Sequence, residues 1–250
     1  DEFVQRLEGK SYQEIAALGG GILNSAARLD KTSEKQLYEQ AAQRLELCAY
    51  QGTGALEIKS GYGLNLEAEL KMLRVAKRLS EKYPVAIKTT FLGAHALPEL
   101  YKNQKDEYVQ QVCKEMIPEV AAQKLADYID VFCEEGYFDL EDTEKILSAG
   151  ARFGLKGKIH VNQFNAIGGV ALGVAMEVLS VDHLEELIEE DLMALENSQT
   201  MPVALPGCSL FLDIPFTPAR AIIDRGLPLA LATDFNPGSA PSGNMNLVVS

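Results

Sequence analysis

Short apolar runs rich in Val, Ile and Thr alternate along the chain with longer stretches in which apolar residues recur at helical spacing. The short runs are almost continuously apolar, which is typical of parallel strands buried on both faces. They predict strands at Ala55–Lys59, Val85–Leu92, Tyr128–Cys133, Gly157–Val161, Leu179–Val181, Met201–Leu205 and Leu227–Ala232. The alternation of strands with helices predicts an α/β fold in which crossover helices join parallel strands.

Two of the predicted helices carry clear start signals. Ser33 precedes a helix over 34–50, with Gln36 in the capping-box position. Asn65 is placed to cap a helix over 66–82 that has leucines on one face. Further helices are predicted at about 105–125, 141–152, 166–176, 185–196 and 217–225. Gly19-Gly20-Gly21 lacks the spacing of a phosphate loop, so we expect a flexible surface segment there.

Seven strands fit either an open doubly wound sheet or an eight-stranded barrel that is one strand short. The positions of polar residues favour the barrel, because His95, His160, His183, Asp234 and Tyr62 follow or close five different strand runs. Polar groups at several strand ends are typical of the active site of a (β/α)8 barrel. An open sheet uses fewer strand ends, at its switch point. We therefore predict an incomplete (β/α)8 TIM-type barrel.

Composition and charge narrow the class of protein. The 250 residues, 47% of them hydrophobic, suit a single barrel domain over residues 1–250. The net charge of −13 argues against a nucleic-acid partner, and no apolar run is long enough for a membrane span. The first residues do not form a signal peptide. The four cysteines, Cys48, Cys113, Cys133 and Cys208, include no CxxC pair. We therefore expect buried free thiols in a protein located in the cytoplasm.

Imidazole and carboxylate on separate strand ends suit a divalent metal, which activates water and polarises a carbonyl. His160 and Asp234 are the two expected ligands, and a catalytic site needs more, so the others are expected on a first strand upstream of Asp1. Structural alternatives stay open. A histidine at a strand end is often only hydrogen-bonded, and Asp234 can simply open a turn. For Glu134 and Glu135 we favour a solvated pair at a loop mouth over an acid/base pair.

Five segments together resemble imidazolonepropionases of the amidohydrolase superfamily. The most distinctive are Lys59-Ser60-Gly61-Tyr62-Gly63 and Ala232-Thr233-Asp234-Phe235-Asn236-Pro237-Gly238, and the others are Phe91–Pro98, Lys158–Phe164 and Ser180–Glu185. The resemblance covers nearly the whole chain. It implies a barrel with one metal ion, iron or zinc, held by a His-x-His on strand one, His160 on strand five and Asp234 on strand eight.

The resemblance also implies roles for other residues. His183 and Asp234 act in catalysis near the metal-bound water. The remaining matched residues contact the substrate, 4-imidazolone-5-propanoate: Tyr62, His95, Gln163, Asn236, Gly238 and Ser239. Gln163 stands where some members carry a carboxylic acid, and an amide cannot shuttle protons.

The implied reaction is hydrolysis of a lactam C–N bond to give N-formimidoyl-L-glutamate in histidine degradation. Two alternatives stay open: another cyclic-amide hydrolase or heterocycle aminohydrolase of the superfamily, and an inactive truncated barrel. The resemblance implies that the chain holds strands two to eight and lacks the first strand, the final helix, a small β-sandwich and a substrate-binding arginine. The full-length protein is expected to be a homodimer.

Overall fold

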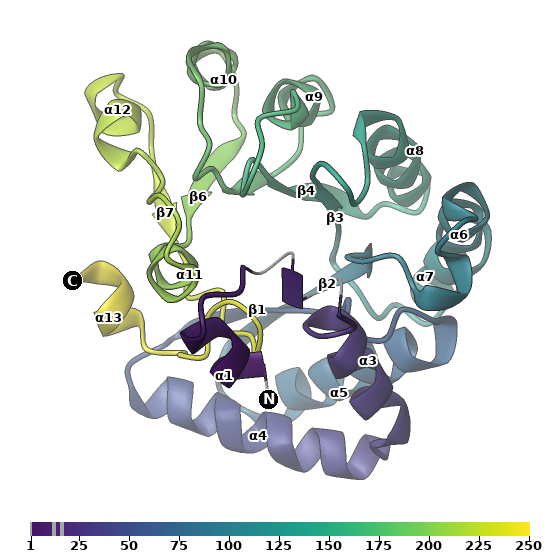
Figure 1. Ribbon diagram of the computed structural model, residues 1–250. Helices are drawn as coiled ribbons and strands as arrows, with labels where there is room; N and C mark the ends of the chain where they lie inside the picture. The colour runs from purple at the N-terminus through teal and green to yellow at the C-terminus, as the bar shows by residue number, and fades with distance from the viewer. Residues whose placement is uncertain (1, 12–13, 16–17) are drawn as a thin grey trace.

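The computed structural model describes residues 2–11, 14–15 and 18–250 (Figure 1). Its centre is one curled sheet of seven strands that are neighbours in chain order and parallel throughout. The strands are β1 (Ala55–Lys59), β2 (Ala86–Ala94), β3 (Tyr128–Cys133), β4 (Lys156–Val161), β5 (Ser180–His183), β6 (Met201–Ala204) and β7 (Ala230–Leu231). The sheet confirms the predicted barrel class, as an incomplete ring whose outer strands are β1 and β7.

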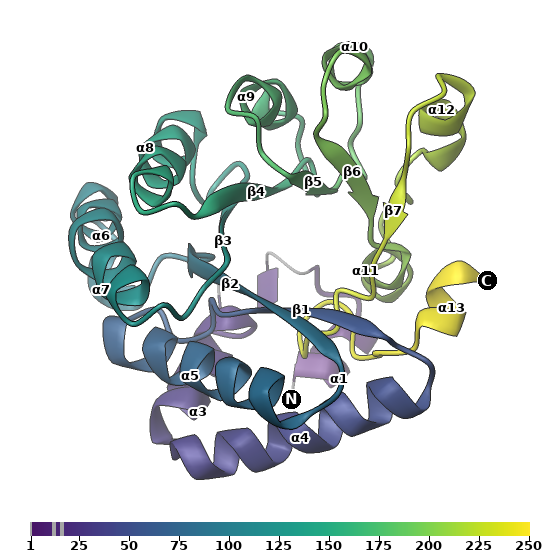
Figure 2. The same cartoon turned by 180° about the vertical axis from the view of Figure 1, so that it is seen from behind.

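Helices cover the outside of the curled sheet (Figures 1 and 2). They are α5 (Leu66–Lys82), α6 (Lys105–Gln111), α7 (Ile117–Ala122), α8 (Leu140–Ala151), α9 (Gly169–Ala175), α10 (Glu189–Glu196) and α12 (Ala219–Asp224). A further helix, α4 (Glu34–Tyr50), packs on α5. No helix among the described residues has the length and apolar character needed to cross a membrane.

The core lies between the strands and this outer layer of helices. Ile129 and Val131 of β3 are completely buried there. Burial of each such side chain contributes about 1.5–3 kcal/mol. Asp130, between them in the chain, points to the opposite face of the sheet, where it meets Lys59 of β1. The alternation of side chains along β3 therefore separates an apolar outer face from a polar barrel interior.

The two helices with clear start signals have the predicted bounds. The Ser33 hydroxyl accepts a hydrogen bond from the Gln36 backbone at 3.3 Å, and the Gln36 side chain accepts one from the Ser33 backbone at 3.2 Å. The Asn65 side chain accepts one from the Ala68 backbone at 3.0 Å. Both caps are confirmed, and both depend only on residues three apart in the chain.

Several predicted bounds were wrong. Strand β2 continues to Ala94, β5 continues to His183, and β7 has only two residues. The helix predicted over 105–125 is interrupted by a π-helical turn at Val112–Met116. Sequence analysis also missed several helical segments: α1 (Glu2–Leu7), α3 (Ile22–Lys31), α11 (Pro206–Leu212), α13 (Met245–Val249) and the 3-10 turn η1 (Glu99–Tyr101).

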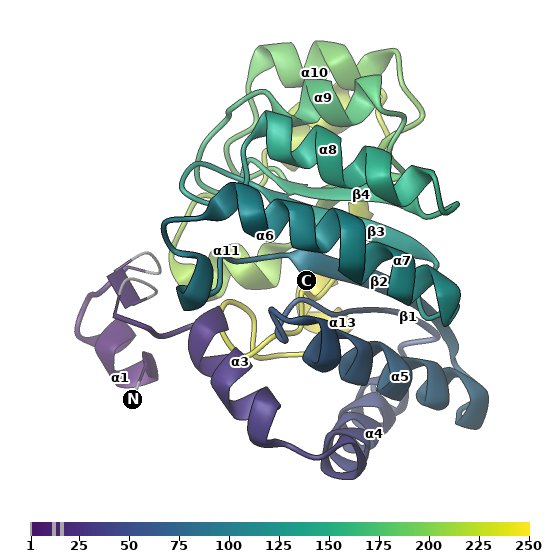
Figure 3. The same ribbon diagram turned by 90° about the vertical axis from the view of Figure 1, so that its right-hand side faces the viewer.

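The N-terminal segment lies near the carboxyl ends of the strands, where α1 approaches α11 (Figure 3). The Arg6 guanidinium stands 4.8 Å from the ring centre of Phe211, and it donates a hydrogen bond to the Gly238 carbonyl at 3.1 Å. The glycine run at 19–21 lies in the turn that leads into α3, and Gly21, with a φ of 62°, is the N-cap residue of that helix.

Candidate active site

The three histidines gather at the carboxyl ends of the strands. The ring of His160, from β4, lies 5.3 Å from that of His183, from β5, and 6.1 Å from that of His95, which follows β2. The distances are between ring centres. Because parallel strands end at the same side of a barrel, His95 and His160 lie close together although they are 65 positions apart in the chain.

The loop after β1 holds His95 and Tyr62 side by side. Gly61 has a φ of 106°, and a Cβ atom there would stand 2.8 Å from the Leu92 carbonyl oxygen. The Gly61 carbonyl oxygen lies 3.0 Å from Nδ1 of His95, and the rings of His95 and Tyr62 meet edge to face at 5.1 Å. A carbonyl oxygen only accepts, so Nδ1 of His95 carries the proton and Nε2 is left as an acceptor.

Glu69, in the first turn of α5, holds this loop through hydrogen bonds, and sequence analysis missed this residue. Its completely buried carboxylate accepts backbone hydrogen bonds from Gly61 at 2.8 Å, Gly63 at 2.7 Å and Leu64 at 2.9 Å. Burial raises the pKa of Glu69, and these hydrogen bonds oppose the rise. The available signal was an acid next to Leu70, within the apolar stripe of a helix.

Asp130 of β3 orients His160. Its Oδ2 atom lies 3.0 Å from Nδ1 of His160, at ion-pair distance without a well-aligned hydrogen bond, and its Oδ1 atom accepts the His160 backbone N–H at 3.2 Å. Burial alone would raise the pKa of Asp130, but His160 and Lys59 together hold that pKa well below its usual range. With Nδ1 facing Asp130, Nε2 of His160 remains to bind a metal.

A network of charged side chains fills the barrel interior beneath the histidines. The Lys59 ammonium group lies 2.7 Å from Asp130, 2.9 Å from Glu57 and 3.4 Å from Asp182. Lys158 of β4 also pairs with Glu57. Sequence analysis did not find this network, although its members interrupt otherwise apolar strands at alternate positions, which is the spacing of one face.

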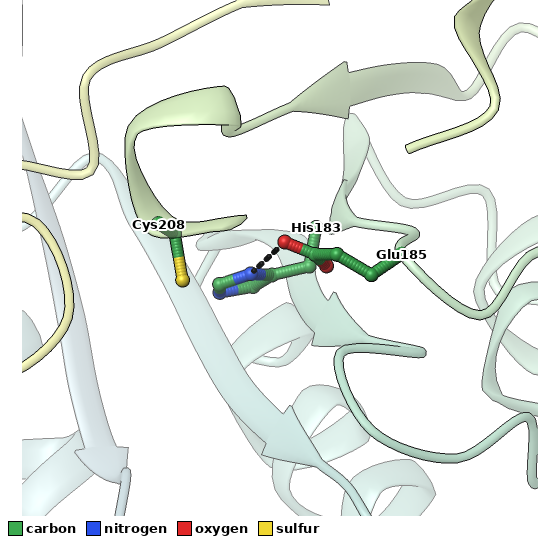
Figure 4. A group of neighbouring side chains, drawn as sticks. All are labelled: His183, Glu185 and Cys208. Carbon is green, nitrogen blue, oxygen red and sulfur yellow. Dashed lines mark hydrogen bonds and ion pairs between the residues drawn. The ribbon is translucent and has the colours of Figure 1, made fainter. Parts of the chain in front are cut away.

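His183 ends β5 in a strained backbone conformation, with a φ of 89°. Its Nδ1 atom lies 3.4 Å from Oε1 of Glu185, and its ring lies between the Glu185 carboxylate and the Cys208 thiol (Figure 4). Burial lowers the pKa of His183, but the Glu185 charge and a hydrogen bond with Cys208 outweigh it and hold that pKa well above its usual value. His183 is therefore held as a cation.

Cys208, near the start of α11, is a second residue that sequence analysis missed at this site. The thiol is completely buried and accepts a hydrogen bond from the Gln163 side chain at 3.3 Å. It was expected only to be a buried free thiol, which it is, as are Cys48 and Cys133. The same expectation was wrong for Cys113, a free thiol that is only partly buried, at the edge of the core beside the Lys145 carbonyl of α8.

Asp234 lies in the loop after β7 with a φ of 49°, held by a compact turn. Ser239 donates a hydrogen bond to its carboxylate at 3.1 Å, and Asn236 donates to its backbone carbonyl at 2.7 Å. The Asn236 side chain also accepts from the Gly238 backbone at 2.8 Å. The turn predicted as the alternative for this segment is therefore present. Burial raises the pKa of the Cys208 thiol, and the nearby Asp234 charge adds a smaller increase.

The prediction that Glu134 and Glu135 form a solvated pair was wrong for Glu134, which is buried. Its side chain is 1% exposed, and it accepts hydrogen bonds from the Phe164 backbone at 2.9 Å and the Asn165 side chain at 3.0 Å. Glu134 thereby joins the loop after β3 to the loop after β4. A tertiary contact 30 residues away, which no local pattern predicts, accounts for its burial.

Two groups of potential metal ligands stand out among the described residues: Asp130 with His160 and Asp182, and His183 with Glu185 and Cys208. In the first group the Lys59 ammonium already supplies a cation to both carboxylates, which leaves the His160 imidazole as the donor. The His160 imidazole, together with the Asp234 carboxylate in the loop after β7, offers the nitrogen and oxygen donors that suit zinc and iron sites.

No family model matches the chain. It is 64% identical over 248 residues to an imidazolonepropionase of Flavobacterium johnsoniae, a match that covers 99% of this chain and 60% of the relative. An imidazolonepropionase of Paraburkholderia phymatum is 45% identical over 250 residues, which are 100% of this chain and 62% of the relative. The chain is a homologue of the imidazolonepropionases. The resemblance drawn from its sequence segments is confirmed, and the chain spans about 60% of the length of such relatives.

Solved structures of other enzymes share the fold. A 5-methylcytosine deaminase of Klebsiella pneumoniae superposes with a TM-score of 0.72 at 9% identity, over 91% of this chain and 60% of that one. An adenine deaminase of Arthrobacter aurescens gives a TM-score of 0.69 at 16% identity, over 95% of this chain and 72% of that one. At such low identity these similarities show the fold alone.

Proposed function

We propose that this imidazolonepropionase homologue belongs to a protein that hydrolyses the lactam C–N bond of 4-imidazolone-5-propanoate to give N-formimidoyl-L-glutamate. The observation that carries the proposal is the 64% identity, over 99% of this chain, to a relative named imidazolonepropionase. Residues 1–250 are its metal-dependent hydrolase domain, in which β1–β7 are strands two to eight of the complete barrel.

His160 and Asp234 are the ligands that this chain supplies to one zinc or iron ion. Two features support the assignment: the orientation of the His160 ring by Asp130, and the compact turn that holds the Asp234 carboxylate. A metal bound there would polarise a carbonyl and activate water. The other ligands, a His-x-His pair, belong to the strand that precedes β1 in the complete barrel.

Asp234 and His183 have different roles in the hydrolysis: Asp234 is the base, and His183 stabilises negative charge. Asp234 takes a proton from the attacking water, whose oxygen forms the new bond to the ring carbonyl carbon. The high pKa of His183 makes it a cation at neutral pH, suited to face the negative charge that develops on the carbonyl oxygen. The lactam C–N bond then breaks, and the proton taken from water ends on the leaving nitrogen.

The substrate ring is held between the Tyr62–His95 pair and the turn after β7. Burial lowers the pKa of His95 to about 3, so His95 is neutral and offers Nε2 as an acceptor. Gln163 contacts the ring as a hydrogen-bonding amide. The Asn236 side chain donates a hydrogen bond to the Ser239 hydroxyl. These two residues therefore contribute to substrate binding by fixing the shape of the turn, which has Gly238 at its tip.

Metal content and hydrolysis test the proposal on two proteins. One is this chain as given; the other, here called the extended protein, carries in addition the segments that flank the matched region in the Flavobacterium johnsoniae relative. We expect the extended protein to hold one metal ion by elemental analysis and to hydrolyse imidazolonepropanoate. His160→Ala should remove the metal, whereas Lys88→Met, a surface change on β2, should not.

Other substrates separate the alternatives. If the extended protein holds metal but hydrolyses other cyclic amides, or deaminates heterocycles, in place of imidazolonepropanoate, the chain belongs to a different amidohydrolase. An extended protein that folds but binds no metal would contradict both assignments, and the inactive-barrel alternative would stand.

The remaining features of the proposal concern the whole protein. A cytoplasmic location is supported by four free thiols, which suit a reducing compartment. A small molecule is the expected partner in place of a nucleic acid or a membrane, consistent with the net charge of −13. The complete protein is proposed to be a homodimer, and size-exclusion chromatography with light scattering on the extended protein tests this.

A further inference from the structure

His183, Glu185 and Cys208 form a closed group of nitrogen, oxygen and sulfur donors beside the proposed catalytic centre (Figure 4). One potential ligand atom of each residue lies within 4.8 Å of the other two, and all three residues are at most 4% exposed. They come from the end of β5, the loop after it, and α11. Imidazole, carboxylate and thiolate are the donor types found in zinc sites.

The Glu185 carboxylate is incompletely satisfied. Oε1 lies 3.4 Å from Nδ1 of His183 and accepts the Ser209 hydroxyl at 3.2 Å. Oε2 is fully buried and has no hydrogen-bond partner among the described residues. A buried carboxylate oxygen without a partner is costly, and a bound cation is one way to satisfy it.

The two donor groups differ in how their negative charge is neutralised. In the Asp130–His160–Asp182 group, the Lys59 ammonium pairs with both carboxylates and neutralises part of their charge. In the part of the chain that the structure describes, no lysine or arginine pairs with Glu185, whose ion-pair partner is His183. The second group therefore has the donors of a metal site and an unmatched oxygen.

We propose that His183, Glu185 and Cys208 bind a zinc-like divalent cation, at a site separate from the one proposed at His160 and Asp234. Coordination needs a Cys208 thiolate and a neutral His183 imidazole, so the metal displaces the thiol proton and one imidazolium proton, and both protons pass to solvent. A water molecule would fill the fourth position of a tetrahedral ion. The site explains why three such donors, which have no lysine or arginine partner among the described residues, converge in a buried position.

Occupation of this site would withdraw His183 from catalysis, and this consequence rests on the proposed function. Excess zinc should then inhibit hydrolysis by the extended protein, and the inhibitor concentration required should rise at least about tenfold in Cys208→Ser. The site itself needs no hydrolytic activity, so it is tested separately.

Cobalt(II) is the probe for the site, because a cobalt–thiolate bond gives a charge-transfer absorption in the near ultraviolet. We expect the 250-residue chain to show this band on titration with cobalt(II) and to lose it on addition of zinc. Cys208→Ser should abolish the band, and Cys113→Ser, which removes a partly exposed thiol elsewhere, should leave it unchanged.

A second variant keeps the test valid if Cys208→Ser does not fold. Glu185→Gln preserves the shape of the side chain and should weaken cobalt binding by at least about tenfold while the band remains. Circular dichroism checks the fold of each variant. The proposal is overturned if the folded chain shows no thiolate band, or if a folded Cys208→Ser variant keeps it. Failure of the extended protein to hydrolyse imidazolonepropanoate would contradict the proposed function and leave this site intact.

Discussion

At the scale of single residues, two glycines decide the shape of the loop that holds Tyr62 and His95. A Cβ atom on Gly61 would stand 3.0 Å from Nδ1 of His95, and one on Gly63 would stand 2.5 Å from the Glu69 backbone nitrogen. The contact at Gly63 is closer than real Cβ atoms essentially ever come, and so is a further contact of 2.8 Å between a Cβ on Gly61 and the Leu92 carbonyl oxygen. The Lys59–Gly63 segment is thus explained by close packing and a left-handed backbone at Gly61, in addition to any contact with substrate.

Gly61→Ala should lower the free energy of unfolding by about 1–3 kcal/mol, because the new Cβ both strains the backbone and displaces the His95 ring. Urea denaturation measures the change. Gly54→Ala is the control, since a Cβ at Gly54 meets nothing within 4 Å. Equal stabilities of the two variants would contradict the role given to Gly61.

His95 should make stability fall as the pH is lowered from about 7.5 to about 5.5. Burial, with a smaller contribution from His160, lowers its pKa to about 3 in the folded state, against about 6.5 in the unfolded chain. Below pH 6.5 the unfolded state therefore binds a proton that the folded state does not, at a cost of up to about 1.4 kcal/mol per pH unit.

Urea unfolding of His95→Gln across this pH range should show a slope that is shallower by that amount. Tyr62→Phe, which changes the neighbouring ring without removing a group that titrates here, should keep the original slope. A His95→Gln variant with unaltered pH dependence would mean that His95 is not buried as a neutral imidazole.

At the scale of elements, local signals specify helices well and strand ends poorly. The caps at Ser33 and Asn65 begin α4 and α5 where they were predicted, because each is made by residues three apart. The ends of β2 and β5 depend on the neighbouring strand, which no local window contains. For this reason His183 proved to be the last residue of a strand, as did Ala94 just before His95.

Removing the cap of α4 tests the contribution of this local signal. Ser33→Ala should cost about 1 kcal/mol, because the Gln36 backbone N–H loses its partner. Thermal or urea denaturation measures the loss. In a double-mutant cycle with Gln36→Ala, the two losses should not add, since each side chain caps the backbone of the other. Additive losses would show that the capping box does not act as a unit.

At the scale of the whole molecule, Lys59 joins strands that are not neighbours. From β1 it pairs with Asp130 on β3 and Asp182 on β5, across the interior of the curled sheet. The backbone ladder links only adjacent strands, whereas these ion pairs, like that of Lys158 on β4 with Glu57 on β1, span the barrel interior. They also hold Asp130 where it orients His160.

Lys59→Met should lower the free energy of unfolding by about 3–5 kcal/mol, since it leaves buried carboxylates without their cation. Lys88→Met is the matched control: Lys88 pairs with Asp127 at the surface, and its loss should cost less than about 1 kcal/mol. Urea denaturation of both variants decides the matter. Similar losses would show that the interior network does not hold the barrel together.

The sequence by itself determined the class of fold, the order of its elements, two helix starts and the strand-end positions of His95, His160 and His183. These follow from apolar period, caps and strand–helix alternation, which are properties of neighbouring residues. Only the tertiary structure decided that Glu69 supports the Tyr62 loop, that Lys59 neutralises the barrel interior, and that Cys208 meets His183. Each of these contacts joins separate elements, and a buried charged group needs a partner that only the curled sheet brings close to it.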